Sequence, residues 1–256
     1  MKSADINNTT IIAVCGKGGV GKTSISAMIA SIIAENPEKK VLAIDADPAV
    51  GLAMALGFPA QKTVDNIRSS LIARVKMGVR ENMNQIAADL DYEVFEAIEE
   101  KNNIAFLAIG RPEEEGCYCQ VNDCLREIIE SISKNFDYVV LDAEAGIEQI
   151  NRRVMENVSH LLLVSDQSVK GIAVAHNIME VSLRLVKCRT CGIILNRVRP
   201  EERNPSAGTG GLSLLGILPE DECIRSFDIE GRSFLDLPEC KARMALRNCL
   251  SVFGIQ

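Results

Sequence analysis

Short apolar blocks recur along this chain, each bounded by polar residues and followed by a stretch in which apolar residues have helical spacing. Continuous apolar runs of this length are typical of parallel strands that are buried on both faces. The predicted strands cover residues 11–15, 41–48, 104–110, 136–142, 160–165, 191–197 and 212–218. Strands that alternate with helices predict an α/β fold with a doubly wound, mostly parallel sheet.

Helices are expected between the strands, at residues 24–34 and at about 122–133, with a charged solvated helix at 91–101. Residues 61–100 look helical and carry no chemical signal, which leaves them open as an insertion that contributes to a partner surface. The last segment, 239–253, has apolar residues at helical spacing but no dense lysine face. This pattern favours packing on the sheet over binding to a membrane surface.

Length and composition fit one globular domain covering residues 1–256. Hydrophobic residues make up 47% and charged residues 25%, and the net charge of −7 argues against broad nucleic-acid binding. Because the sequence has neither an apolar run long enough to span a bilayer nor the apolar core of a signal peptide, we expect a cytoplasmic protein. In a reducing compartment the odd count of nine cysteines favours thiols or metal ligands over disulfides.

The most specific motif follows the first predicted strand, where residues 16–23 read G-K-G-G-V-G-K-T. The motif matches the P-loop pattern G-x-x-x-x-G-K-[ST] in the required context of a strand before and a helix after. Its backbone N–H groups and the helix N-terminus would bind phosphates, Lys22 would reach the β- and γ-phosphates of ATP, and Thr23 would ligate Mg²⁺. The alternative is a glycine-rich turn without a ligand. The predicted nucleotide-binding residues here are Gly16, Lys17, Gly18, Gly19, Val20, Gly21, Lys22, Thr23 and Ser24.

Carboxylates follow two of the predicted strands. Asp45 and Asp47 end the second strand, and Asp142 ends the fourth. Open parallel sheets bind ligands beyond the carboxyl ends of their strands, so these acids are expected near the phosphates and Mg²⁺. Asp142 would hold the hydration shell of the magnesium ion. For Asp45 and Asp47, an ordinary polar turn at a strand end remains the alternative.

The segment K-G-G-V-G-K-T resembles the deviant P-loop of the MinD, ParA and nitrogenase iron protein superfamily. In that superfamily the lysine at the position of Lys17 crosses a dimer interface to the partner's nucleotide, so the resemblance implies an ATP-dependent homodimer. The sequence D-A-D-P at 45–48 is similar to the first switch, which gives Asp47 the role of positioning or activating the attacking water. The D-x-x-x-G spacing from Asp142 to Gly146 resembles the second switch, where a glycine amide meets the γ-phosphate.

The same resemblance covers the base of the nucleotide. Asn196, at the end of the sixth predicted strand, resembles the asparagine that recognises adenine in that superfamily. Its amide offers one donor and one acceptor to the edge of the base. Arg197 stands where many relatives carry lysine, and Pro219 lies where the chain of the family passes the adenine.

A second specific feature is the pair Cys117-Tyr118-Cys119. In an extended loop residues i and i+2 point the same way, and Gly116 favours a loop here, so both thiolates could grip one ion. Two thiolates half-complete a tetrahedral site, which a two-fold dimer would finish. The alternatives are two thiols without metal, or participation of Cys124 from the following helix. The pair Cys188 and Cys191 is interpreted as packing at a helix end and a strand start.

Around this pair the sequence G-R-P-E-E-E-G-C-Y-C at 110–119, with D-A-E-A-G-I-E at 142–148, is similar to the CooC-type ATPases. The resemblance implies a role in nickel insertion into carbon monoxide dehydrogenase or acetyl-CoA synthase. It makes Ni²⁺, with Zn²⁺ as a competitor, the expected ion at Cys117 and Cys119, and the apo form of the nickel enzyme the expected client. Glu144 replaces a glycine that relatives often carry, which changes the second switch.

Two other functions compete with this interpretation. An electron donor like the nitrogenase iron protein would bridge the dimer with a [4Fe–4S] cluster, but those relatives use two widely separated cysteines per chain. A positioning or partition ATPase would act on DNA or membrane, against which the acidic charge and the cysteine pair both argue. We therefore expect neither a nucleic-acid nor a membrane partner.

Overall fold

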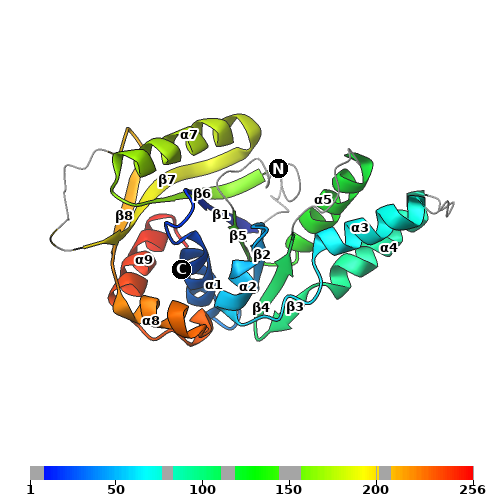
Figure 1. The fold of residues 1–256 in the computed structure, drawn as a ribbon, viewed down its shortest axis with the longest axis horizontal. Coiled ribbons are helices and arrows are strands. Elements are labelled where there is room, and N and C mark those ends of the chain that lie inside the picture. Colours follow the sequence, from blue (N-terminus) through cyan, green and yellow to red (C-terminus); the bar gives the residue numbers. More distant parts are fainter. Residues whose placement is uncertain are drawn as a thin grey trace, which may run out of the picture.

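The computed structural model describes residues 9–76, 83–110, 119–143, 157–199, 201 and 209–255, with the side chains of all these except 75, 76, 83–87 and 119–121. Within them the chain forms one eight-stranded sheet in the order β3-β4-β2-β5-β1-β6-β7-β8 (Figure 1). The strands are β1 Thr10–Gly16, β2 Val41–Asp45, β3 Glu99–Lys101, β4 Ile104–Ala108, β5 Tyr138–Asp142, β6 Asn157–Ser165, β7 Lys187–Val198 and β8 Leu214–Pro219. Every pairing is parallel except that of β3 with β4, which confirms the predicted fold class.

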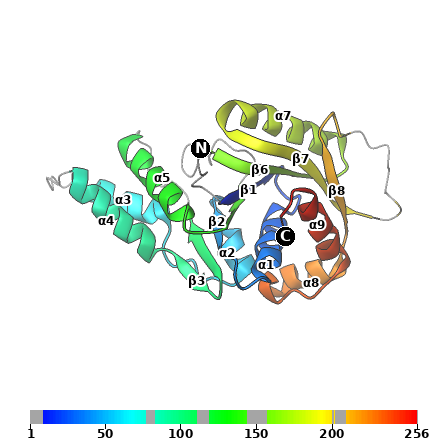
Figure 2. The ribbon, with the colours of Figure 1, turned by 180° about the vertical axis from the view of Figure 1, so that it is seen from behind.

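Helices cover both faces of the sheet (Figures 1 and 2). On β1, Ala13 and Cys15 belong to one apolar cluster and Ile12 and Val14 to the other, because successive strand residues point to opposite faces. The first cluster includes residues of α3 Val64–Lys76, α4 Met83–Glu96, α5 Cys119–Ser133 and α7 Val169–Leu185. The second includes residues of α1 Lys22–Ala34, α2 Gly51–Leu56, α8 Glu222–Glu230, η2 Phe234–Asp236 and α9 Lys241–Val252.

The C-terminal helix packs on the sheet, as its apolar spacing predicts. Leu246 and Leu250 of α9 are buried in the second cluster, where they join Leu218 of β8. Among the described residues, no helix is long and apolar enough to cross a membrane.

The helix predicted at residues 91–101 is wrong in its second half. Helix α4 ends at Glu96, and Glu99–Lys101 form the short edge strand β3, which pairs antiparallel with β4. Tertiary contacts override the helical pattern, because the Glu99 carboxylate accepts hydrogen bonds from the backbone N–H groups of Ala60 and Gln61. A charged edge strand also discourages pairing with another chain.

The interpretation of Cys188 and Cys191 also needs correction. The pair does not straddle a helix end and a strand start, because α7 ends at Leu185 and both cysteines lie within β7. Both are half-buried and pack against the first apolar cluster, in keeping with a packing role.

Candidate nucleotide-binding site

The loop that carries the P-loop sequence lies between β1 at the centre of the sheet and α1. Gly19 and Gly21 have φ angles of 81° and 91°, a left-handed backbone that glycine adopts without strain. At Gly21 a side chain is also excluded by space, because a Cβ atom would lie 2.6 Å from Nδ2 of Asn196. Gly18 and Gly19 are exposed, and nothing lies within 4 Å of where their Cβ atoms would be. Their backbone is therefore open to a ligand.

Lys22 is the first residue of α1, and only 8% of it is exposed. Its Nζ donates a hydrogen bond of 3.4 Å to the backbone oxygen of Lys17, so the side chain folds back along the loop. A buried ammonium with one long hydrogen bond suits an anionic ligand, which would give it stronger charge-assisted partners. The phosphate-binding role of Lys22 stays a prediction, which this geometry allows.

Asp45 and Asp142 end neighbouring parallel strands and are register partners at the carboxyl edge of the sheet. Asp142 is 1% exposed, and its Oδ1 accepts a hydrogen bond of 3.0 Å from Oγ of Ser26. Its Oδ2 is buried and has no hydrogen-bond partner among the described residues. The hydroxyl of Thr23 also donates a hydrogen bond to the Asp142 carboxylate. This hydroxyl and the free carboxylate oxygen together fit the donor set of a hydrated Mg²⁺ ion.

The protonation of the two acids reflects this burial. Burial raises the pKa of Asp45 to about 7, with a further contribution from the charge of Asp142. Burial also raises the pKa of Asp142 to about 6, although hydrogen bonds from Thr23 and Ser26 and the charge of Lys22 oppose the shift. A bound divalent cation would favour the ionised form of both acids.

The carboxylate of Asp45 holds a loop, whereas the sequence predicted that it contacts the ligand. Its Oδ1 accepts from the N–H of Asp47 at 3.0 Å and its Oδ2 from the N–H of Leu52 at 2.8 Å, so both oxygens hold the loop between β2 and α2. Asp47 is half-exposed in that loop, and its Oδ1 accepts from the N–H of Ala49 at 2.9 Å. Val50, the next residue, has a left-handed backbone with φ of 51°. This conformation is unusual for a β-branched residue, so the loop is a strained segment beside the phosphate site.

The residues predicted to surround the base line one cavity of about 250 Å³. Asn196 and Arg197 come from β7 and Pro219 from the end of β8, and Ser24 of α1 lies on the same cavity. Nδ2 of Asn196 donates to the backbone oxygen of Val20 at 2.8 Å, and Nη1 of Arg197 donates to that of Gly19 at 3.1 Å. Both side chains therefore connect the base cavity to the phosphate loop.

Three functional candidates were not predicted from the sequence. Ser26 resembles an ordinary small residue of an apolar helix, yet it lies one turn after Lys22 and bonds Asp142. Asp228 lines the base cavity and accepts a hydrogen bond of 3.4 Å from Oγ of Ser24, and burial raises its pKa. Asp221, on the same cavity, accepts from the N–H groups of Cys223 and Ala242 and so joins the starts of α8 and α9. An aspartate before a helix was the available signal for Asp221.

Lys17 is half-exposed at the start of the loop. Its charge contributes to lowering the pKa of Asp166, which is held down mainly by a hydrogen bond from the Ser168 hydroxyl. The ammonium of Lys17 is therefore close enough to Asp166, just beyond β6, for its charge to be felt there.

Several residues singled out in the sequence lie wholly or partly outside the described part of the structure. Gly146, Glu144 and Cys117 lie outside the described residues, and Cys119 is known only as the first residue of α5. The helix therefore begins at the second cysteine of the pair, whereas the sequence predicted a loop through both. Cys124 is half-buried against the first apolar cluster, and burial raises its pKa. In the described part of the chain, no three His, Cys, Asp or Glu residues are arranged to hold a metal ion.

The site predicts opposite defects for Lys22→Ala and Asp47→Asn. The first variant should lose ATP binding, because it removes the buried charge facing the phosphates. The second should bind ATP normally and lose hydrolysis, because an acid that acts on the water matters mainly in the transition state. Calorimetric ATP titration and a phosphate-release assay measure the two effects. Wild-type affinity in the lysine variant, or wild-type turnover in the asparagine variant, would contradict the corresponding assignment.

Comparison with known sequences agrees with this geometry. The AAA domain family matches residues 9–187. An uncharacterized ATP-binding protein of Methanocaldococcus jannaschii is 36% identical over 236 residues, which cover 90% of this chain and 92% of that protein. The carbon monoxide dehydrogenase accessory protein CooC of Rhodospirillum rubrum is 30% identical over 244 residues, covering 90% of this chain and 91% of that protein.

Solved structures show the same fold. The cell division ATPase MinD of Pyrococcus furiosus superposes with a TM-score of 0.69 at 23% identity, covering 96% of this chain and 98% of that one. A ParA family ATPase of Chlorobium tepidum superposes with a TM-score of 0.71 at 19% identity, with the same coverage of 96% and 98%. The chain belongs to the AAA domain family and has the fold of the MinD and ParA ATPases.

Proposed function

We propose that this protein is an ATP-hydrolysing, dimerising metallochaperone. It binds Ni²⁺ through Cys117 and Cys119 and assists nickel insertion into an enzyme such as carbon monoxide dehydrogenase or acetyl-CoA synthase. The observation that carries the proposal is the 30% identity with CooC along 90% of the chain. The Cys-x-Cys pair, which ends where α5 begins, supplies the soft ligands that such a cargo needs.

The nucleotide half of the mechanism rests on described residues. The loop backbone and Lys22 would hold the phosphates, while Thr23 and Oδ2 of Asp142, which has no hydrogen-bond partner among the described residues, would hold the hydrated magnesium ion. Magnesium neutralises the charge that develops on the phosphates. Asp47 orients the attacking water, and Lys17 reaches the nucleotide of a second copy. Hydrolysis in this scheme would change the contacts of the strained loop that Asp45 holds.

The cargo half requires two chains. Each chain contributes two thiolates, and a two-fold dimer would bring four together around one ion. Zinc prefers such a tetrahedral sulfur site and nickel tolerates it less well, so zinc should compete in vitro. The nucleotide and the metal would then select the same dimer.

Within one subunit, a chain of contacts leads from Asp45, beside the phosphate loop, to α5, which begins at Cys119. The backbone N–H of Ile109 donates to the backbone oxygen of Asp45 at 2.8 Å. The backbone N–H of Asp65 donates to the backbone oxygen of Ile109 at 2.9 Å. The buried Asp65 pairs with the buried Arg68 at 3.4 Å, and Nε of Arg68 donates to Oδ1 of Asn122 at 3.0 Å. Asn122 lies in the first turn of α5, which begins at Cys119. A shift of the Asp45 loop can therefore reach the helix that carries the cysteine.

We expect ATP and metal to strengthen each other's binding by the same factor, because both favour one dimer. The coupling should tighten metal binding by roughly five- to 150-fold, the usual range for allosteric proteins. Anaerobic titration of Ni²⁺ and Zn²⁺ into the nucleotide-free form and the ATP-analogue form measures the factor and the stoichiometry, which should be one ion per two chains. Cys117→Ser should abolish metal binding and leave ATP binding intact, whereas Cys188→Ser, at the start of β7, should change neither.

The outcomes separate the competing functions. One ion per chain, or equal metal affinity in both forms, would contradict the shared site. A brown protein with absorbance near 400 nm, as expected of an iron–sulfur cluster, would instead favour an electron donor. ATP hydrolysis stimulated by DNA or liposomes would favour a positioning ATPase.

Loss of the Arg68 contact should reduce the coupling between ATP and metal more than either affinity. Arg68→Met removes the contact to α5 and costs roughly 3 kcal/mol of stability, because it also breaks the buried ion pair with Asp65. Asn122→Ala breaks the same contact and keeps the Asp65–Arg68 pair, so it serves where the first variant is unstable. Arg74→Met is the matched control, since Arg74 lies on the same helix but pairs with Asp89 of α4. Full coupling in Asn122→Ala would rule out this connection.

A further inference from the structure

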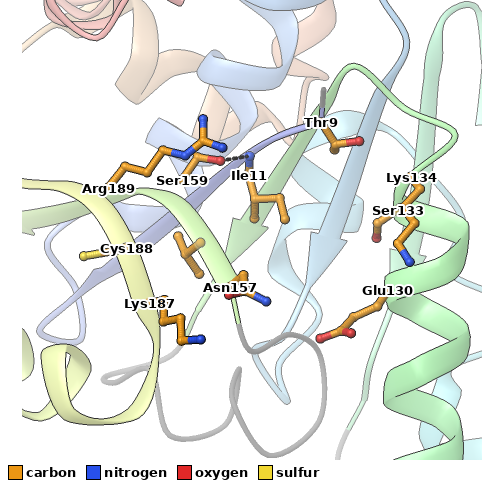
Figure 3. Close-up of a pocket in the computed structure, with 11 residues that line it drawn as sticks. Thr9, Ile11, Glu130, Ser133, Lys134, Asn157, Ser159, Lys187, Cys188 and Arg189 are labelled. Carbon is orange, nitrogen blue, oxygen red and sulfur yellow. Dashed lines mark hydrogen bonds between the residues drawn. The ribbon is translucent and has the colours of Figure 1, made fainter. Parts of the chain in front are cut away.

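A second cavity, of about 360 Å³, lies at the amino ends of the strands, whereas the phosphate loop lies at their carboxyl ends. It is lined where β1, β6 and β7 begin and by the last turn of α5 (Figure 3). The seven residues of β1 separate it from the phosphate loop by roughly 20 Å, given the usual rise per strand residue. The cavity is thus a separate site and not an extension of the nucleotide site.

Positive charge is concentrated around this cavity, although the whole chain has a net charge of −7. Lys134 comes from the residue after α5, and Lys187 and Arg189 come from the start of β7. None of the three forms an ion pair or a side-chain hydrogen bond that is identified within the described residues. Among the described lining residues Glu130 is the one carboxylate, so this described part of the lining carries an excess of two positive charges.

The polar groups of the cavity suit a small anion that also carries oxygen atoms. Figure 3 shows Glu130, Ser133 and Lys134 on one wall and Lys187, Cys188 and Arg189 on the other. Ser159 lies between these walls, where its Oγ accepts a hydrogen bond of 3.1 Å from the N–H of Ile11, which leaves the hydroxyl proton for another acceptor. The side chain of Cys188 points away from the other wall, so its thiol is not directed at the centre of the cavity.

The positive charge at this cavity affects the pKa of a neighbouring histidine. Burial lowers the pKa of His160, and the charge of Arg189 lowers it further. The cavity volume falls within the range of small-molecule sites, which is roughly 300–1,000 Å³. Size and charge together favour a compact ligand with at least two negative charges.

We propose that this cavity, defined by Lys134, Lys187, Arg189 and Ser159, is a second ligand site that binds a small polyanion, either a phosphate ester or a polycarboxylate. The two lysines and the arginine neutralise the anionic groups, and the Ser159 hydroxyl donates to one of their oxygens. Because the site lies far from the phosphate loop, it should be filled independently of ATP.

The test uses pyrophosphate and citrate as probes, titrated calorimetrically into the full chain at low salt. Lys22→Ala provides the background, because it removes binding of pyrophosphate to the phosphate loop. In that background at least one probe should bind, and its affinity should fall as ionic strength rises. Citrate binding alone would identify a polycarboxylate site and pyrophosphate binding alone a phosphate site.

Adding Lys187→Ala and Arg189→Ala should weaken the binding by roughly ten- to a hundredfold, since each removes a charged hydrogen-bond donor. The matched control adds Lys101→Ala and Lys241→Ala, which remove two exposed cations elsewhere and should leave the affinity unchanged. Thermal unfolding without ligand confirms that both variants are folded. Failure of both probes to bind at millimolar concentration, or an unchanged affinity in the first variant, would overturn the proposal.

Discussion

The structure depends on the burial of two carboxylates at the carboxyl ends of β2 and β5. Asp45 and Asp142 are register partners, and both are removed from water beside the P-loop. Burial disfavours the charged form of each acid and raises both pKa values, and at Asp45 the charge of Asp142 adds to the shift. The charge of Lys22 opposes the shift at Asp142. This arrangement suits a divalent cation and a phosphate chain, which would favour the ionised form of both acids.

Much of the fold and the phosphate site could be predicted from local patterns. Buried parallel strands are uninterrupted apolar runs, and the P-loop is contiguous, so both can be recognised without long-range information. The edge strand β3 was missed because Glu99–Lys101 form a strand only through pairing with β4 and the contacts of Glu99 with residues 60 and 61. The hydrogen bonds of Asp45, and the contact of Asn196 with Val20, join positions far apart in sequence or depend on loop geometry. No single-sequence pattern encodes them.

The sheet separates three chemical environments. The carboxyl ends of its strands carry the candidate nucleotide site, the amino ends carry the cationic cavity, and α3 and α5 connect Asp45 to the helix that begins at Cys119. Buried charges on this connection, Asp65 and Arg68, fix the relative position of two helices more strictly than apolar packing would, since either charge is costly to leave unpaired. Such a link can transmit a loop movement to a helix end without a change in the sheet itself.

Without nucleotide, Asp45 and Asp142 retain protons near neutral pH, and we expect Mg²⁺·ATP to expel them. Because the pKa values of Asp45 and Asp142 are raised to about 7 and about 6, binding of preformed Mg²⁺·ATP at pH 6.5 should release on the order of one proton per site. The release should vanish by about pH 8.5, where both acids are already ionised. Calorimetric titration in two buffers of different ionisation enthalpy measures this number directly, with Asp142→Asn as the comparison. Proton release at pH 6.5 that falls in the variant supports the account, and no release at pH 6.5, or equal release in both proteins, would contradict it.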